Sequence, residues 1–157
     1  MNRSLWLAAA VLAPRLLCFV FNENLGGDAI ARTWLAHRWS EAPLLMTSFA
    51  DGARQFGPLH LYLLALAELF WPSILHAGRV VSLLAGALTA WPLHALTARR
   101  FGPSAATFAV LGFAFWGLHV QCSTTSASEA LNLLLVMGAV SLFDLALERR
   151  WAWWGAA

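Results

Sequence analysis

The sequence has few charged residues and no lysine. Asp, Glu, Lys and Arg make up 11% of its 157 residues, and all ten basic residues are arginine. Soluble globular proteins carry about a quarter charged residues, so this composition excludes an ordinary soluble domain. The net charge of +2 is small, and no arginine-rich run with interleaved aromatics occurs. Both observations argue against a nucleic-acid partner.

Cysteine is also scarce. Cys18 and Cys122 lack the spacing of metal ligands, and we expect two separate thiols in apolar surroundings. A disulfide between them on the outer side of a membrane is the alternative. The sequence contains no internal repeat and no low-complexity tract, so nothing in it indicates a solenoid or a disordered tail.

Hydrophobic residues dominate instead, at 60% of the chain with a mean hydropathy of +0.64. We therefore predict an all-α, polytopic integral membrane protein, surrounded by membrane lipids. Apolar runs of about 20 residues are typical of spanning helices, and four such spans are predicted, at about 4–21, 79–98, 104–120 and 130–147. The second should be kinked near Pro92.

The first apolar stretch contains Arg15, which must face protein or snorkel. A signal peptide is an alternative, because residues 1–10 have a basic start and small residues. Apolar character continues beyond Arg15 as far as Phe21. This continuation favours an uncleaved spanning helix.

A polar interval, 22–57, follows the first span and contains Glu23, Asp28, Glu41 and Asp51. Within it, residues 28–39 predict a short helix with two tryptophans on its apolar face, which suits a helix lying in the membrane interface. The apolar stretch 56–71 includes only fourteen residues from Pro58 to Trp71, or roughly 21 Å of helix. That length favours an interfacial element over a span.

Arginines mark the loops expected in the cytoplasm. Arg3, Arg99-Arg100 and Arg149-Arg150 all satisfy the positive-inside rule if the chain crosses twice between Arg3 and Arg99. Two crossings require that 56–71 does not cross. Residues 22–78 and 121–128 then lie on the outer side, together with Asp28 and Glu129.

Another apolar run, 151–157, follows Arg150. It resembles the first turn of a further helix, so we expect the sequence to be a fragment of a longer polytopic protein. Four spans should not enclose a full substrate pocket, and we expect the fragment alone to be inactive.

Several motifs occur in a characteristic order. They are Gly27-Asp28, Phe56-Gly57-Pro58-Leu59-His60-Leu61-Tyr62, Gly78-Arg79-Val80-Val81-Ser82-Leu83-Leu84-Ala85-Gly86, Ala98-Arg99-Arg100-Phe101-Gly102 and Ser128-Glu129-Ala130-Leu131. This order resembles the GT-C membrane glycosyltransferases, in particular the protein O-mannosyltransferase, aminoarabinose-transferase and RgtA-like relatives. The resemblance covers nearly all of the chain but only about the amino-terminal third of such an enzyme.

The resemblance implies inverting transfer of a sugar from a polyprenyl-phosphate donor to an acceptor at the outer face of a bacterial inner membrane. Asp28 matches the acid that acts as general base or orients the acceptor, a role that suits a partly desolvated carboxylate. Many relatives have Asp-Glu where this chain has Asp28-Ala29, and Pro-Pro where it has Gly57-Pro58. The missing Glu argues against a paired-acid or metal site. We expect no cofactor besides the lipid-linked donor, and a divalent-metal requirement stays open.

Four further residues are candidates for substrate binding, and each has a structural alternative. Glu129 matches the second outer-face acid of the family, but Ser126 and Glu129 also have capping-box spacing. Arg79 is placed to stabilise the leaving lipid phosphate or to snorkel. His60 is placed to contact phosphate or acceptor, or to be an amphipathic side chain. Trp34 lies one and a half helical turns from Asp28, and Asp28 itself is a good helix N-cap.

Two other functions compete with a glycosyltransferase. A transporter or flippase fragment would line a path with charged residues, whereas only Arg15 and Asp144 interrupt the spans. A non-catalytic membrane scaffold would tolerate loss of Asp28. The acids at 28 and 129 favour the enzyme, because ionisable groups at the membrane are costly and usually functional.

Overall fold

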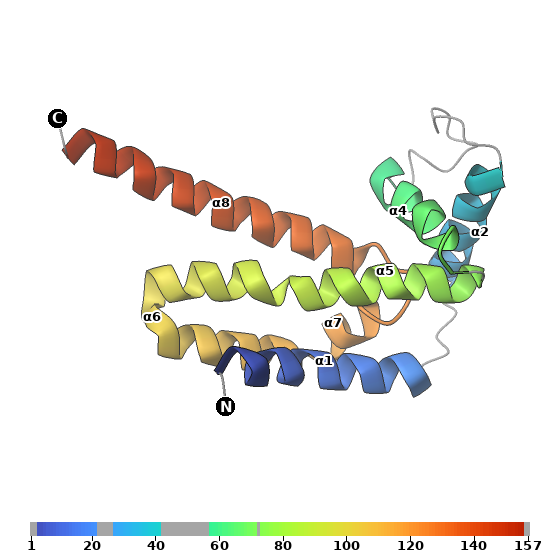
Figure 1. The fold of residues 1–157 in the computed structure, drawn as a ribbon, viewed down its shortest axis with the longest axis horizontal. Coiled ribbons are helices and arrows are strands. Elements are labelled where there is room, and N and C mark those ends of the chain that lie inside the picture. The colour runs from blue at the N-terminus through green and yellow to red at the C-terminus, as the bar shows by residue number, and fades with distance from the viewer. Residues whose placement is uncertain (1–2, 22–26, 42–56, 72, 156–157) are drawn as a thin grey trace.

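The computed structural model describes residues 3–21, 27–41, 57–71 and 73–155, and these residues form helices without any strand. The predicted all-α class is therefore confirmed. The helices, shown in Figure 1, are α1 (Arg3–Phe21), α2 (Gly27–Glu41), α4 (Pro58–Glu68), α5 (Ile74–Leu88), α6 (Ala90–Ala114), α7 (Gly117–Cys122) and α8 (Glu129–Gly155). Predictions on Glu23, Asp51 and Phe56 lie outside the described residues.

Three stretches of the described chain are long and apolar enough to cross a membrane: Ser4–Phe21, Leu75–Ala114 and Glu129–Arg149. The middle one contains two of the four predicted crossings, because α6 reverses direction at Gly102 and runs back towards α1 (Figure 1). Gly102 has φ 87° and ψ 169°, a backbone conformation open essentially to glycine alone. The reversal point is therefore set by a single residue.

Near Pro92, where a kink was predicted, α5 and α6 are separated only by Thr89, whose φ of −58° and ψ of −28° are themselves helical. Proline has no N–H, so Pro92 cannot bond the carbonyl of Leu88 four residues earlier. The helix resumes at once, since the N–H of Leu93 donates to the Thr89 carbonyl at 3.3 Å.

The prediction of one continuous helix over 104–120 is wrong. Helix α6 ends at Ala114, Phe115 has a non-helical ψ of 8°, and α7 starts at Gly117. At this break the buried guanidinium of Arg15, from α1, donates to the Ala114 carbonyl at 3.4 Å. That carbonyl would otherwise accept an N–H four residues later in a continuing helix.

Helix α8 extends beyond the predicted span 130–147 as far as Gly155. Residues 151–155 therefore continue α8, and the prediction that this run starts another helix is wrong. The charged residues 148–150 end the apolar stretch without ending the helix, because Glu and Arg are both good helix formers.

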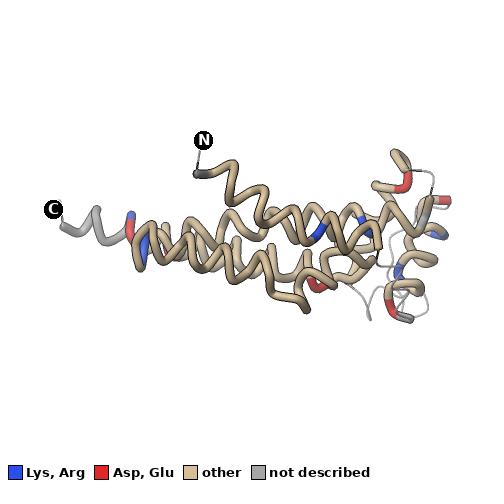
Figure 2. Tube along the Cα trace, turned by 90° about the horizontal axis from the view of Figure 1, so that it is seen from below, with Lys and Arg blue, Asp and Glu red and all other residues tan. Residues whose placement is uncertain are grey.

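The two ends of the bundle differ. Helices α2 and α4 lie at one end with the start of α8, while the reversal in α6 lies at the other (Figure 1). Charged residues concentrate at both ends, with few between them (Figure 2). At the reversal end Arg99 Nε lies 3.2 Å from Asp144 Oδ2, and Arg100 also pairs with this carboxylate. Asp144 thus has two cationic partners.

The segment 123–127 lies very close to α5. An added Cβ at Gly86 would come within 2.6 Å of the Ser123 Cβ, and one at Gly78 within 2.9 Å of the Ser126 Cβ. Between them the Ser82 hydroxyl donates to the Ala127 carbonyl at 3.1 Å. Small residues at four-residue spacing allow this close approach, which holds the start of α8 against α5.

Candidate functional site

Helix α2 turns its polar side towards the protein. Arg32, Thr33 and Ala36 are buried, and the Thr33 hydroxyl donates to the Ala29 carbonyl at 2.8 Å. Trp34 is 57% exposed and packs edge-on against His37, with ring centroids 6.1 Å apart. The polar face predicted for this helix therefore packs on the other helices, and Trp34 points away from them.

Arg32 connects α2 to the start of α8. Its Nη1 lies 3.7 Å from Oε2 of Glu129, whose side chain is 58% exposed. Asp28 is exposed and lies one turn before Arg32, and residues four apart are neighbours on a helix surface. The two predicted acids, far apart in the sequence, thus flank one buried arginine.

Asp28 is in the first turn of α2, which begins at Gly27. The N-cap position therefore precedes it, and the capping alternative for Asp28 does not apply. A carboxylate in the first turn is still favoured by the helix dipole. The Asp28 side chain is exposed at this position.

His60 is in α4, only 3% exposed, and neither ring nitrogen has a hydrogen-bond partner among the described residues. Burial, and then the positive charge of Arg32, lower the pKa of His60 to about 4. The imidazole is therefore neutral at physiological pH. A neutral ring has one donor and one acceptor nitrogen to offer.

Arg79 joins three parts of the chain. Its Nε donates to the Thr124 carbonyl at 2.7 Å, its Nη2 donates to the Phe19 carbonyl, and its guanidinium lies 4.2 Å from the centre of the Phe19 ring. These contacts hold the end of α1 and the segment before α8 on α5. A phosphate contact by Arg79 stays a prediction.

A second set of contacts fixes α2 on α4. His37 Nδ1 lies 3.1 Å from Oε2 of the largely buried Glu68, and the Ser40 hydroxyl donates to the same oxygen at 3.3 Å. The rings of Trp39 and Tyr62 meet with centroids 4.6 Å apart. Because α2 is anchored along its length, Asp28 and Arg32 are held in place.

Sequence reasoning missed two features of this end of the bundle. The pairing of Arg32 with Glu129 was not predicted; the position of Arg32 four residues after Asp28 was the available signal. His119 was not predicted as a candidate. Of the two alternatives predicted for Arg15, contact with protein is confirmed and snorkelling is not. Arg15 is fully buried and bonds to His119.

Cys18 and Cys122 are both free thiols, so the prediction of two separate cysteines is confirmed and the disulfide alternative is wrong. Within the described ranges, no three His, Cys, Asp or Glu side chains are grouped to hold a metal ion.

Comparison with known proteins assigns the chain to a family. Residues 55–157 match the family model described as dolichyl-phosphate-mannose-protein mannosyltransferase. The match includes His60, Arg79 and Glu129, whereas Asp28, Arg32 and Trp34 lie before it. No curated protein and no solved structure matches the chain. Because the match extends over more than half of the residues, the protein belongs to the dolichyl-phosphate-mannose-protein mannosyltransferase family of GT-C membrane glycosyltransferases, which use a lipid-linked sugar donor.

Proposed function

We propose that the protein transfers a sugar, with inversion, from a polyprenyl phosphate to an acceptor at the outer face of a bacterial inner membrane. The described residues form the amino-terminal part of that enzyme's site, and further spans complete it. The observation that carries this proposal is the grouping of Asp28, Arg32, Glu129 and His60 at one end of the bundle. Acids and a cation at the membrane boundary are typical of functional sites.

Asp28 acts as the general base. Its carboxylate accepts the proton of the acceptor hydroxyl while the hydroxyl oxygen attacks the anomeric carbon, and the bond to the lipid phosphate breaks from the opposite face. Such a base must reach within about 3 Å of the hydroxyl. The exposure of Asp28 at the first turn of α2 supports this access.

Arg32 positions the acids. A buried guanidinium is always charged, so its pairing with Glu129 holds the start of α8 against α2. In the proposal Glu129 orients the acceptor, while His60 contacts the acceptor or donor phosphate. Arg79 stabilises the leaving phosphate, and Trp34 contacts sugar.

A transporter is the competing function, and the contacts of the charged residues within the apolar stretches count against it. Arg15 bonds to a carbonyl and an imidazole, and Asp144 pairs with two arginines at the end of the bundle. Charges that are held by protein partners serve packing and do not line a path between the helices.

Substitution of Asp28 by Asn in the full-length enzyme tests the proposal. Loss of a general base typically lowers the rate about 10² to 10⁴-fold, and we expect that loss in sugar transfer from polyprenyl-phosphate mannose, with normal expression and membrane insertion. Glu41→Gln is the matched control, since Glu41 is an exposed acid at the other end of α2. Transfer by Asp28→Asn at the wild-type rate would remove Asp28 from the mechanism.

A further inference from the structure

Arg15 is a charged side chain buried inside an apolar helix. It lies in the stretch Ser4–Phe21, which is long and apolar enough to cross a membrane, and it is 0% exposed. An arginine near a helix end usually extends its long side chain to the membrane interface. Charged groups that stay inside a membrane are costly and usually serve the function of the protein. The proposed reaction does not use Arg15, so its burial requires a separate reason.

The guanidinium of Arg15 bonds to both sides of the break between α6 and α7. Its Nη1 donates to the carbonyl of Ala114, the last residue of α6, at 3.4 Å. Its Nη2 lies 3.0 Å from Nδ1 of His119 in α7, and Nδ1 accepts this bond because arginine has only donors. Nη1 also donates to the Val11 carbonyl at 2.7 Å, within α1 itself. Arg15 thus links α1 to the chain before and after the break.

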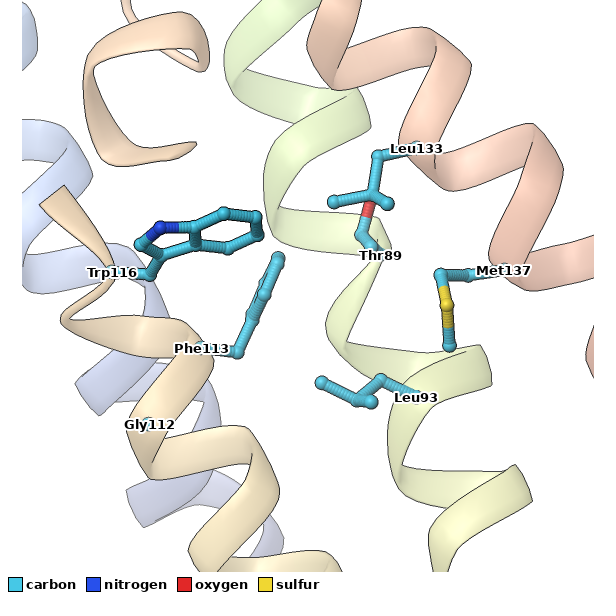
Figure 3. A pocket seen from close by; sticks show the side chains of 7 residues that line it. All are labelled: Thr89, Leu93, Gly112, Phe113, Trp116, Leu133 and Met137. Carbon is cyan, nitrogen blue, oxygen red and sulfur yellow. The ribbon is translucent and has the colours of Figure 1, made fainter. Parts of the chain in front are cut away.

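Aromatic rings surround the same break. The Arg15 guanidinium lies 4.8 Å from the centre of the Phe113 ring, and the Trp116 ring stacks on His119 with centroids 5.8 Å apart. Phe113 and Trp116 also line an apolar cavity of about 330 Å³ between α6 and α8 (Figure 3). Because protein interiors are normally close-packed, this cavity means that packing against α8 contributes little to holding the break. The bonds to α1 are on the side that is filled.

The direction that the chain takes after the break determines where α8 begins. Segment 123–127, which follows α7, lies against α5, where the Ser82 hydroxyl donates to the Ala127 carbonyl at 3.1 Å. Helix α8 then starts at Glu129, whose Oε2 lies 3.7 Å from Nη1 of Arg32. If α6 continued without a break, α7 would take another direction and segment 123–127 would leave α5. The place of Glu129 therefore depends on the break.

We propose that Arg15 is a positioning residue for the candidate site: it holds the break between α6 and α7 and, through α7 and segment 123–127, keeps Glu129 beside Arg32. Arg15 itself does not touch substrate. This inference rests on the proposed function, in which Glu129 orients the acceptor.

Cysteine labelling tests the position of segment 123–127 without any need for activity. In full-length protein with Cys18 and Cys122 replaced by Ala, Thr125→Cys introduces a thiol at a site that is 6% exposed. In detergent, Arg15→Met should make a maleimide react with this thiol about 10-fold faster, which corresponds to about 1.4 kcal/mol in the free energy of local opening. Arg99→Met is the matched control, because Arg99 also lies in an apolar stretch but bonds to Asp144 at the reversal end. It should leave the labelling rate unchanged.

Sugar transfer by the full-length enzyme tests the consequence for the site. Arg15→Met should lower the rate of transfer from polyprenyl-phosphate mannose about 10²-fold, the loss expected when a side chain that orients a reactant is displaced by about 1 Å. Arg99→Met should transfer at the wild-type rate.

Gly117→Pro supplies a break that does not depend on Arg15. Gly117 is the first residue of α7, where proline is favoured, and an added Cβ there meets no heavy atom within 4 Å. Trp116 before it has the extended backbone, φ −68° and ψ 99°, that a following proline requires. Proline at 117 cannot continue α6, because it lacks an N–H and clashes with the carbonyl four residues earlier. Added to Arg15→Met, Gly117→Pro should therefore restore most of the protection at position 125 and most of the transfer.

The outcomes separate a role at the break from other roles. Unchanged labelling and transfer in Arg15→Met would overturn the proposal, and so would a loss of transfer that Gly117→Pro does not relieve. If Arg15→Met alone does not accumulate, recovery of the protein by Gly117→Pro supports the proposal and continued absence overturns it. Failure of the proposed function has a different result: the wild-type enzyme would then transfer no mannose, while the labelling rates would still report the role of Arg15.

Discussion

Arg32 is the residue that brings the separate candidates together. It is buried in α2 and pairs with Glu129 of α8, and its charge adds to the larger effect of burial in lowering the pKa of His60 in α4. Because the Glu129 side chain is 58% exposed, solvent screens this pair, and its role is to position the two helices more than to stabilise them. The pairing therefore links the packing of three helices to the placement of Asp28, one turn away.

The neutral His60 makes stability depend on pH. In the unfolded chain this histidine binds its proton near pH 6.5, whereas in the folded protein it does so only near pH 4. Between these values the unfolded state holds more protons, so folding stability falls as the pH is lowered from 6.5 to 4. The full shift corresponds to roughly 3 kcal/mol.

Unfolding of the wild type and of His60→Leu, in one detergent at pH 7 and at pH 4.5, measures this contribution. The wild type should lose up to about 3 kcal/mol more than the variant. At pH 7 the variant should be no less stable, since His60 has two unpaired nitrogens to lose. Equal acid sensitivity in both proteins would show that His60 is not held neutral.

At the scale of single residues, the sequence indicated which side chains are candidates for function but not which residues they contact. Asp28 and Glu129 could be selected because acids are rare in an apolar chain and their positions resemble a family. The pairing of Arg32 with Glu129, and of Arg15 with His119, joins residues about a hundred positions apart. Such contacts depend on how the helices pack, which no local pattern contains.

Helix boundaries were predictable where a local cause sets them. The apolar length of 4–21 and the proline before 59–68 mark α1 and α4. The break after Ala114 was not predictable from local sequence, because the carbonyl at the break bonds to a guanidinium from another helix. The continuation of α8 past Arg150 was missed because loss of hydrophobicity was interpreted as the end of the helix.

The reversal within α6 depends on the backbone of Gly102. With φ at 87° and no heavy atom within 4 Å of an added Cβ, Gly102→Ala should destabilise through backbone strain alone, by about 1–3 kcal/mol. Gly138→Ala is the matched control: it also has open space, but its backbone is helical. Alanine there should stabilise by up to about 1 kcal/mol.

Thermal unfolding of both glycine variants in the same detergent separates these effects. The expected midpoints lie below the wild type for Gly102→Ala and at or above it for Gly138→Ala. If both midpoints rise, the reversal does not need a left-handed residue at position 102.

The two ends of the molecule carry different groups of charged residues. Arg99, Arg100 and Asp144 meet at the reversal end, whereas Arg32, Glu129 and the α2–α4 pair lie at the other. The positive-inside rule assigns the arginine-rich reversal to the cytoplasm. If so, we expect the end with the candidate site to face outwards, where the proposed function would consume a lipid-linked sugar.

Labelling of single cysteines tests this orientation, in full-length protein with Cys18 and Cys122 replaced by Ala. A membrane-impermeant maleimide added to intact cells should modify cysteine introduced at the exposed positions Arg38 and Leu75, and should modify one at Phe101 only after the membrane is permeabilised. The reason is geometric. If 56–71 lies in the interface, α2 and the start of α5 stay on one side, and the twenty-odd apolar residues from Leu75 carry the chain across before Phe101.

Labelling at Arg38 but not Leu75 would mean that 56–71 crosses the membrane. Asp28 and Glu129 would then lie on opposite faces, which is incompatible with the Arg32–Glu129 contact and with a shared site.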